Sequence, residues 1–216
     1  MLEADLASDS RSDAEGASCP DDDQLVALAK THRQFFGDLY DRYYGRILNY
    51  AYRRTLDVAL AEEITSNTFF KALGGLSDYE HRGKFGAWLY RIAGNEVRLH
   101  WRARQRRPDD HANWREDYAR VRFAANQATT AEDVEEQARQ FAKLHEALRR
   151  LPERYQTVLS LRYFEGMSYD EVADVLEKKI GSVKSLVHRG LERLRRELEG
   201  KGETFWQDLH YPMREE

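Results

Sequence analysis

The chain has 216 residues, of which 41% are hydrophobic and 33% are charged, with only four prolines. This composition is typical of a folded, charge-rich and mostly helical protein, and it excludes disorder along the whole length. The single cysteine, Cys19, excludes an internal disulfide and a zinc site with paired thiolates. No apolar run reaches the ~18 residues that span a bilayer, so we expect a cytoplasmic protein without membrane insertion.

The net charge of −4 is unevenly distributed along the chain. Residues 1–24 hold eight acidic side chains against one arginine, so the remainder of the chain carries a net charge of +3. The acidic segment has no hydrophobic period, and we expect a disordered tail over residues 1–23. The positive remainder is compatible with binding to phosphates of a nucleic acid.

Apolar residues recur at helical spacing through residues 24–107, which we interpret as one helical domain. Its last helix is expected over 84–106. Arg91, Asn95, Arg98 and Arg102 follow each other there at i, i+4, i+7 and i+11, and so form a polar stripe on one face. The opposite face is expected to be buried, Trp88 included, and it comprises Phe85, Trp88, Leu89, Ile92 and Leu99.

Residues 108–135 have no lasting period and are predicted to be a linker, with a short helix at about 114–123. A second helical domain is expected over 136–199, followed by a tail at 200–216. Within it Pro152 is a typical first helical residue, Gly166 is a typical helix stop, and Ser168 with Glu171 predicts a capping box. Two helices joined by about four residues then predict a helix-turn-helix.

The last helix of this motif has two distinct faces. Its apolar stripe, predicted to be buried, comprises Val183, Val187, Leu191, Leu194 and Leu198. The other face carries donors that suit phosphates and base edges, namely Ser182, Ser185, Arg189, Arg193 and Arg196. A single basic stripe is more often a solvated surface. Two such stripes in two domains favour a nucleic-acid interface.

Four segments in order carry a family resemblance: FGDLYDRYYGRILNYAYRR, AEEITSNTFFKAL, FGAWLYRIAGNEVRLHWR and LPERYQTVLSLRYFEGMSYDEVADVLEKKIGSVKSLVHRGLERLRREL. They resemble the extracytoplasmic-function (ECF) sigma factors of the sigma-70 family. The resemblance implies an all-α fold of two small helical domains, a sigma-two-type bundle and a sigma-four-type helix-turn-helix, joined by a flexible linker. It further implies a non-enzymatic protein without cofactor or metal, which directs RNA polymerase core to promoters by recognising −35 duplex and −10 opened DNA.

The resemblance also assigns residues to each contact. The second domain would meet the β flap of the polymerase, and its −35 contacts would be Lys179, Ser182, Lys184, Ser185, His188, Arg189 and Arg193, with Ser182, Ser185 and Arg189 at base edges. The −10 contacts would be Asp78, Tyr79, His81, Arg82, Lys84, Asn95, Arg98 and Arg102. The β′ coiled coil would contact Glu62, Glu63, Thr65, Ser66, Asn67 and Phe70.

Two departures from the family pattern carry hypotheses of their own. The polymerase-facing helix has Leu60, Ser66 and Asn67 where many members have acidic or Gln-Glu residues, and hydroxyls at 65, 66 and 68 suggest tuning by a Ser/Thr kinase. The turn of the helix-turn-helix lacks the usual glycine after Leu176. Another residue is therefore expected at positive φ, with Gly181 or Ser182 starting the recognition helix.

Other readings of the sequence remain open. A dimeric helix-turn-helix regulator that acts without polymerase would explain the second domain alone. An enzyme would have to use scattered histidines, and none has metal-ligand or nucleophile spacing (His32, His81, His100 and His111). The aromatic-containing tail at 200–216 either packs on the second domain or binds an anti-sigma protein.

Overall fold

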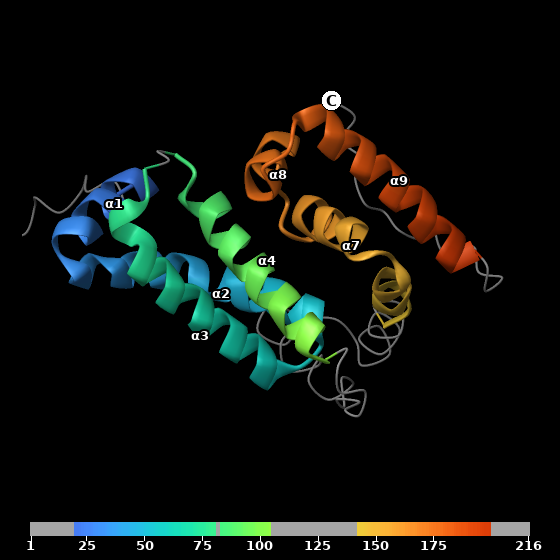
Figure 1. The fold of residues 1–216 in the computed structure, drawn as a ribbon, viewed down its shortest axis with the longest axis horizontal. Helices are drawn as coiled ribbons and strands as arrows, with labels where there is room; N and C mark the ends of the chain where they lie inside the picture. The colour runs from blue at the N-terminus through green and yellow to red at the C-terminus, as the bar shows by residue number, and fades with distance from the viewer. Residues whose placement is uncertain (1–19, 81–82, 105–141, 200–216) are drawn as a thin grey trace, which may run out of the picture.

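The computed structural model describes residues 20–80, 83–104 and 142–199, and every regular element within these ranges is a helix. The all-α prediction is therefore confirmed. Figure 1 shows α1 to α4 gathered on one side and α7 to α9 on the other, with α4 beside the second group. The first domain contains α1 (Asp22–Thr31), η1 (Arg33–Phe35), α2 (Phe36–Thr55), α3 (Val58–Gly75), η2 (Leu76–Asp78) and α4 (Phe85–Arg104). The second contains a helix over 142–150, α7 (Glu153–Leu159), the π-helical turn η3 (Ser160–Phe164), α8 (Tyr169–Leu176) and α9 (Ile180–Glu199).

Helices α2 and α4 pack closely against each other within the first domain. A Cβ at Gly86 would lie 2.9 Å from the hydroxyl oxygen of Tyr43, so only glycine permits this approach. Further along the same pair of helices, the fully buried rings of Tyr50 and Tyr90 meet edge to face with centroids 5.4 Å apart. The polar stripe of α4 is thus carried on a rigid support.

The first helix of the first domain includes acidic residues that were predicted to belong to the disordered tail. Helix α1 begins at Asp22 and is capped by Asp21, whose carboxylate accepts from the Gln24 amide at 2.8 Å. Asp22 forms a 2.6 Å ion pair with Arg42 of α2. Asp23 accepts from the backbone amide of Gly83 at 2.6 Å, ahead of α4. These carboxylates therefore anchor the bundle, and the expected tail boundary at residue 23 was too late.

The second domain places the helix-turn-helix on α7. Ser168 and Glu171 form the predicted capping box at the start of α8, and Gly166 takes the positive φ of 69° expected at a helix stop. The turn after α8 has Glu177 at φ 51°, which confirms that a residue other than glycine adopts the left-handed conformation. Helix α9 begins at Ile180, so the predicted start at Gly181 or Ser182 was slightly late.

Several predicted segments lie outside the described residues, and one predicted core residue of α4 is exposed. The predicted linker at 108–135 with its helix at 114–123, the tail at 200–216 and residues 1–19 all lie outside the described residues. Leu99, predicted on the buried face of α4, is 60% exposed, because the buried face at this end of the helix is centred on Ala93 and Val97 instead. Trp88 packs against the core as predicted, with its ring 4.8 Å from that of Tyr79.

Candidate nucleic-acid interface

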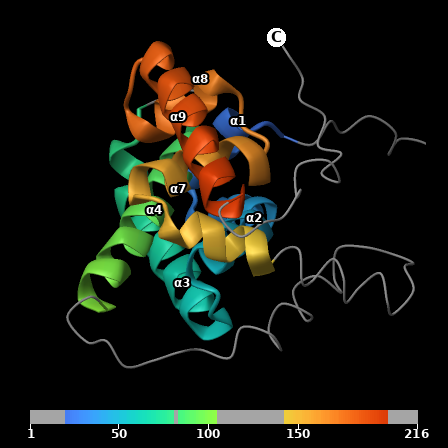
Figure 2. The same cartoon turned by 90° about the vertical axis from the view of Figure 1, so that its right-hand side faces the viewer.

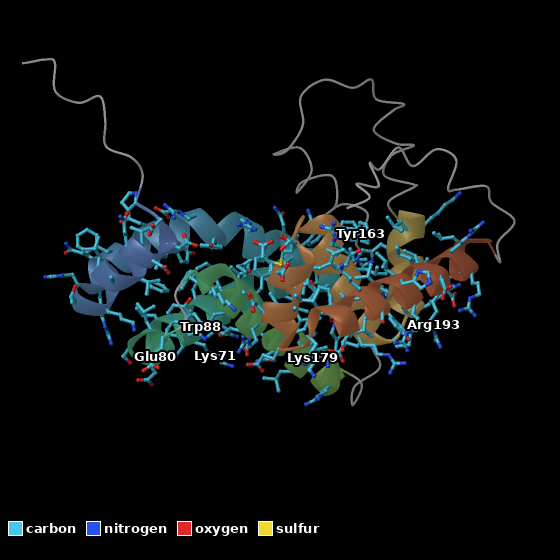
Figure 3. All side chains as sticks on the ribbon, turned by 90° about the horizontal axis from the view of Figure 1, so that it is seen from above. Lys71, Glu80, Trp88, Tyr163, Lys179 and Arg193 are labelled. Carbon is cyan, nitrogen blue, oxygen red and sulfur yellow. The ribbon has the colours of Figure 1, made fainter. Side chains whose placement is uncertain are left out.

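Helix α9 presents its polar face outward along its whole length. Val183, Val187 and Leu194 lie in the core of the second domain, at 0%, 2% and 5% exposure. Leu198 is buried as well, at 5% exposure, whereas Leu191 is only partly buried, so the predicted stripe is confirmed at four of its five positions. In Figure 3, Lys179 lies just before α9 and Arg193 lies farther along the helix. All the residues expected to contact −35 DNA are exposed: Lys179, Ser182, Lys184, Ser185, His188, Arg189 and Arg193.

Contacts within the second domain orient several of these side chains. The Lys184 ammonium lies 5.5 Å from the centre of the Tyr169 ring, and the Arg193 guanidinium lies 5.3 Å from that of Tyr155. Arg189 Nε donates to the carbonyl of Ser185, one turn earlier, at 3.2 Å. The cations are thus held along the helix, which lowers the entropy lost when they bind an anion.

Helix α4 presents a shorter polar face. Asn95, Arg98 and Arg102 are exposed, and Arg98 donates to the Asn95 side chain. Lys84 precedes the helix and is exposed as well, and Asp78 ends η2 in an exposed position. Asn95, Arg98 and Arg102 share one face of α4 by their spacing. Their separation along α4 suits contacts to a strand backbone rather than to a single base.

The aromatic pocket expected between residues 77 and 84 is not formed by Tyr79. Its side chain is only 5% exposed, and it packs on Phe85 and Trp88 with ring centroids 5.9 and 4.8 Å away. Burial raises the pKa of the Tyr79 hydroxyl to about 12. Its ring is therefore a core element and cannot stack on a flipped base. His81 and Arg82 lie outside the described residues.

Helix α3 exposes a mixed acidic and aromatic surface. Glu62, Glu63, Ser66 and Asn67 are exposed. Phe70, one turn beyond, is 78% exposed, which is unusual for a ring that size. An exposed aromatic ring bordered by carboxylates is typical of a docking surface for another protein.

Thr65 is not part of that surface, contrary to the sequence-based assignment. Its side chain is fully buried, and its hydroxyl donates to the Ala61 carbonyl at 2.7 Å. Thr68 is equally buried and donates to the Ile64 carbonyl. Positions 61, 65, 68 and 72 follow each other at i, i+4, i+7 and i+11, a spacing that identifies one inward face. A kinase could therefore reach only Ser66 of the three hydroxyls.

The structure also brings together charges that sequence reasoning did not pair. Lys84 Nζ lies 2.7 Å from Asp174 of α8, and Arg91 forms an ion pair with Glu177 at the end of α8. Arg91 also donates to the Asp174 carbonyl at 2.9 Å. Arg91, expected in the free polar stripe, therefore faces the second domain. No local pattern could reveal these pairs, because their partners lie more than 80 residues apart.

Within 20–80, 83–104 and 142–199, no cluster of three or more histidine, cysteine or acidic residues is arranged to hold a metal ion. None of the helices in these ranges is both long and apolar enough to cross a membrane.

Family models match both domains. The model described as Sigma-70 region 2 matches residues 39–107, and the model described as Sigma-70, region 4 matches residues 141–194. The two matches fall on the bundle that carries α3 and α4 and on the domain that carries the helix-turn-helix.

Curated relatives cover most of the chain. It is 32% identical to the RNA polymerase sigma-H factor of Pseudomonas aeruginosa, over 82% of this chain and 94% of that protein. It is 31% identical to the RNA polymerase sigma factor YlaC of Bacillus subtilis, over 77% of this chain and 94% of that one. The ECF RNA polymerase sigma factor SigW of Bacillus subtilis is 29% identical, over 81% and 95%.

Solved structures share the fold. CnrH, determined in complex with the cytosolic domain of CnrY, matches with a TM-score of 0.59 at 22% identity, over 82% of this chain and 96% of CnrH. The sigma factor RpoE of Bartonella quintana, determined with the anti-sigma factor NepR, matches with a TM-score of 0.55 at 20% identity, over 76% and 96%.

Proposed function

The chain belongs to the ECF sigma factors of RNA polymerase, and from this premise we propose which of its side chains read the promoter and which bind the polymerase. As a sigma factor it directs the polymerase core to promoters and takes part in transcription initiation. Nothing favours the dimeric regulator, since both domains match sigma-factor models.

The −35 element is read by α9 inserted in the major groove. The observation that carries this proposal is the exposure of all the candidate side chains on a helix whose opposite face is buried. Ser182, Ser185 and Arg189 read base edges near the start of the helix. The remaining donors contact phosphates and set the register, and they are Lys179, Lys184, His188 and Arg193.

The test is Arg189→Ala measured by transcription and by binding of the holoenzyme to promoters varied at each −35 position. We expect a loss of about 1–3 kcal/mol on the preferred sequence and a relaxed preference at one base pair. Arg150→Ala, an exposed arginine on the helix over 142–150 and outside this face of α9, is the matched control and should change little. An equal loss on every sequence would reassign Arg189 to a phosphate.

The opened −10 strand lies along the polar side of the first domain. Asn95, Arg98 and Arg102 bind the backbone of this strand. Lys84 and Asp78, which precede α4 in the chain, also contact it. His81 and Arg82 are also proposed to contact the −10 strand, on the basis of the sequence alone. Tyr79 is excluded as a stacking platform by its burial.

The β′ coiled coil docks on α3 through Glu62, Glu63, Ser66, Asn67 and Phe70, and the second domain meets the β flap. Phe70→Ala should weaken binding to core polymerase by more than about 1 kcal/mol, as expected for an aromatic residue at an interface centre. Leu99→Ala removes another exposed apolar side chain and is the control. Equal affinities of both variants for core would remove Phe70 from the interface.

Ser66 is the one hydroxyl of this helix that a kinase could modify, since its neighbours at 65 and 68 are buried. A phosphate there would add about 1.5 to 2 negative charges to an acidic surface. Ser66→Glu is therefore expected to change the affinity for core polymerase. Identical affinities of Ser66→Glu and wild type would count against this switch.

The remaining assignments follow from the family. We place the chain in the cytoplasm with its polymerase, and we propose that it acts without catalytic activity of its own. The domains are assigned to 21–107 and 136–199, with a linker at 108–135 between them and tails at 1–20 and 200–216, since Asp21 already caps the first helix. Regulation by an anti-sigma protein is proposed because the sigma factor RpoE, which shares this fold, was determined in complex with the anti-sigma factor NepR.

A further inference from the structure

A small cavity lies where the second domain packs on the last turn of α2. Figures 1 and 2 both show the helix over 142–150, drawn in yellow, beside α2, and His145 Nε2 of that helix donates to the carbonyl of Arg53. The volume of the cavity is about 10 Å³, which is room for one water molecule or one ion of similar size. Its polar wall comes from both domains and comprises Arg53, Arg54, His145, Arg149, Gln156 and Ser160.

Arg54 brings a buried positive charge to this cavity. The residue is 5% exposed, and its Nε and Nη1 have no hydrogen-bond partner among the described residues. Burial lowers the pKa of the Arg54 guanidinium, but an arginine in a protein stays protonated all the same. A buried charge is costly unless a group of opposite charge and hydrogen bonds compensate it. The cavity therefore favours a ligand that accepts hydrogen bonds and carries negative charge.

The other polar groups of the wall do not neutralise Arg54. Arg53 is already paired with Glu165 at 2.6 Å, so that carboxylate is engaged. Burial lowers the pKa of His145 to about 4, and the charges of Arg149 and Arg54 act in the same direction, so the imidazole is neutral near pH 7. Among the described residues, no carboxylate lines the cavity. The wall thus lacks one negative charge.

We propose that this cavity binds one small monovalent anion, chloride, between the two domains. Arg54 Nε and Nη1 donate to the ion from α2, and the hydroxyl of Ser160, which is 6% exposed, donates from the second domain. Hydrogen bonds to an ionised partner are stronger than those between neutral groups. A water molecule would fill the same volume but would leave the charge of Arg54 uncompensated.

The size of the cavity selects among anions. A chloride ion is only slightly larger than a water molecule, whereas phosphate, sulfate and carboxylates have several heavy atoms and need more than the space of one water. Because both domains supply donors, the complete site exists only in the folded chain. Chloride should therefore stabilise the folded state by binding, in addition to any general effect of salt.

The first measurement is urea denaturation of the full chain at neutral pH, in sodium chloride and in sodium glutamate of equal ionic strength. Glutamate screens exposed charges to the same extent but is too large for the cavity. Above the Kd for chloride, each tenfold rise in chloride should lower the ratio of unfolded to folded molecules by about tenfold. General effects of either salt on hydrophobic burial act on the parent chain and on its variants alike, so the comparison between them removes these effects.

Three variants locate the ion. Arg54→Met removes the uncompensated charge and should abolish the specific effect of chloride. Arg46→Met makes the same change at an exposed arginine of α2 that does not line the cavity, and it should retain the effect. Ser160→Val keeps Arg54 but removes the hydroxyl and fills part of the cavity, so it should also abolish the effect. Ser160→Val decides the question if Arg54→Met does not fold.

The line width of the chloride NMR signal detects the bound ion directly. Solutions of the full chain and of Arg46→Met should broaden the signal more than solutions of Arg54→Met or Ser160→Val. Equal line widths in all four, without a specific effect of chloride on stability, would show that the cavity holds water only and would overturn the site. An effect of chloride that persists in Arg54→Met and Ser160→Val would place the ion elsewhere and would overturn it as well.

Discussion

The basic faces of α4 and α9 are built from the same kinds of residue but differ in what they touch. On α9 the cations are steered by rings of their own domain, such as Tyr155 beneath Arg193. On and just before α4, Arg91 and Lys84 are paired with carboxylates of the other domain. A basic stripe in a sequence thus predicts a surface for anions, but the anion can come from the same chain.

The largest expected effect is a loss of stability when the buried side of α4 is truncated. Leu89 is fully buried in the first domain, and Leu89→Ala should lower the free energy of unfolding by about 2–5 kcal/mol, since it leaves a cavity. Urea denaturation of the full chain checks this value. Leu99→Ala on the same helix is the exposed control. A similar loss of unfolding free energy in both variants would mean that α4 does not pack on the first domain through Leu89.

The next effect is a pH dependence centred on the contact between the domains. Burial lowers the pKa of His145 to about 4, with Arg149 and Arg54 nearby acting in the same direction and Glu146 against it. The unfolded chain binds this proton at about pH 6.5, so the free energy of unfolding should fall as the pH drops from 6.5 towards 4. The full difference amounts to about 3 kcal/mol.

Denaturation of His145→Gln between pH 4 and 7 isolates that effect. The variant should lose most of the pH dependence, and His188→Gln, which removes an exposed histidine of α9, should retain it. Burial raises the pKa of the Glu165 carboxyl. The contribution of Glu165 to stability therefore has the opposite sign, since it is present at low pH and is lost as the pH rises through the pKa of the folded state. A steep dependence that survives in His145→Gln would assign it to another group.

A smaller effect is expected at the start of α8. The Ser168 hydroxyl accepts from the Glu171 amide at 3.1 Å, and Ser168→Ala should cost about 1 kcal/mol of stability in the second domain. Thermal unfolding measures the loss. Ser182→Ala, an exposed serine near the start of α9, is the control. No difference between the two would show that the cap contributes nothing.

The smallest effect separates the two basic faces by their dependence on salt. For holoenzyme binding to a −35 duplex fragment, Lys184→Ala should reduce the slope of log K against log salt by about 0.9, the value for one lost phosphate contact. Lys84→Ala should leave that slope unchanged, because Lys84 lies on the first domain. Equal reductions would place both lysines on the same duplex.

Much of the local structure could be predicted from short-range patterns. The buried face of α9, the capping box at Ser168 and the stop at Gly166 each depend on residues within a few positions of one another. The inward position of Thr65 could also have been read from its helical spacing. The family resemblance assigns Thr65 to the polymerase contact by position alone, whereas in the structure its hydroxyl bonds to its own helix.

The sequence by itself determined the two helical domains, the sigma-factor family and the polar face of the recognition helix, because periodicity and caps act within one or two helical turns. Only the tertiary structure decided that Tyr79 belongs to the core, that Arg54 is buried, and that Glu165 meets Arg53 across 112 positions of sequence. Such contacts depend on how the helices cross and dock, which no local pattern encodes. For the same reason, only the fold could show that Lys84 and Arg91 pair with carboxylates of the second domain.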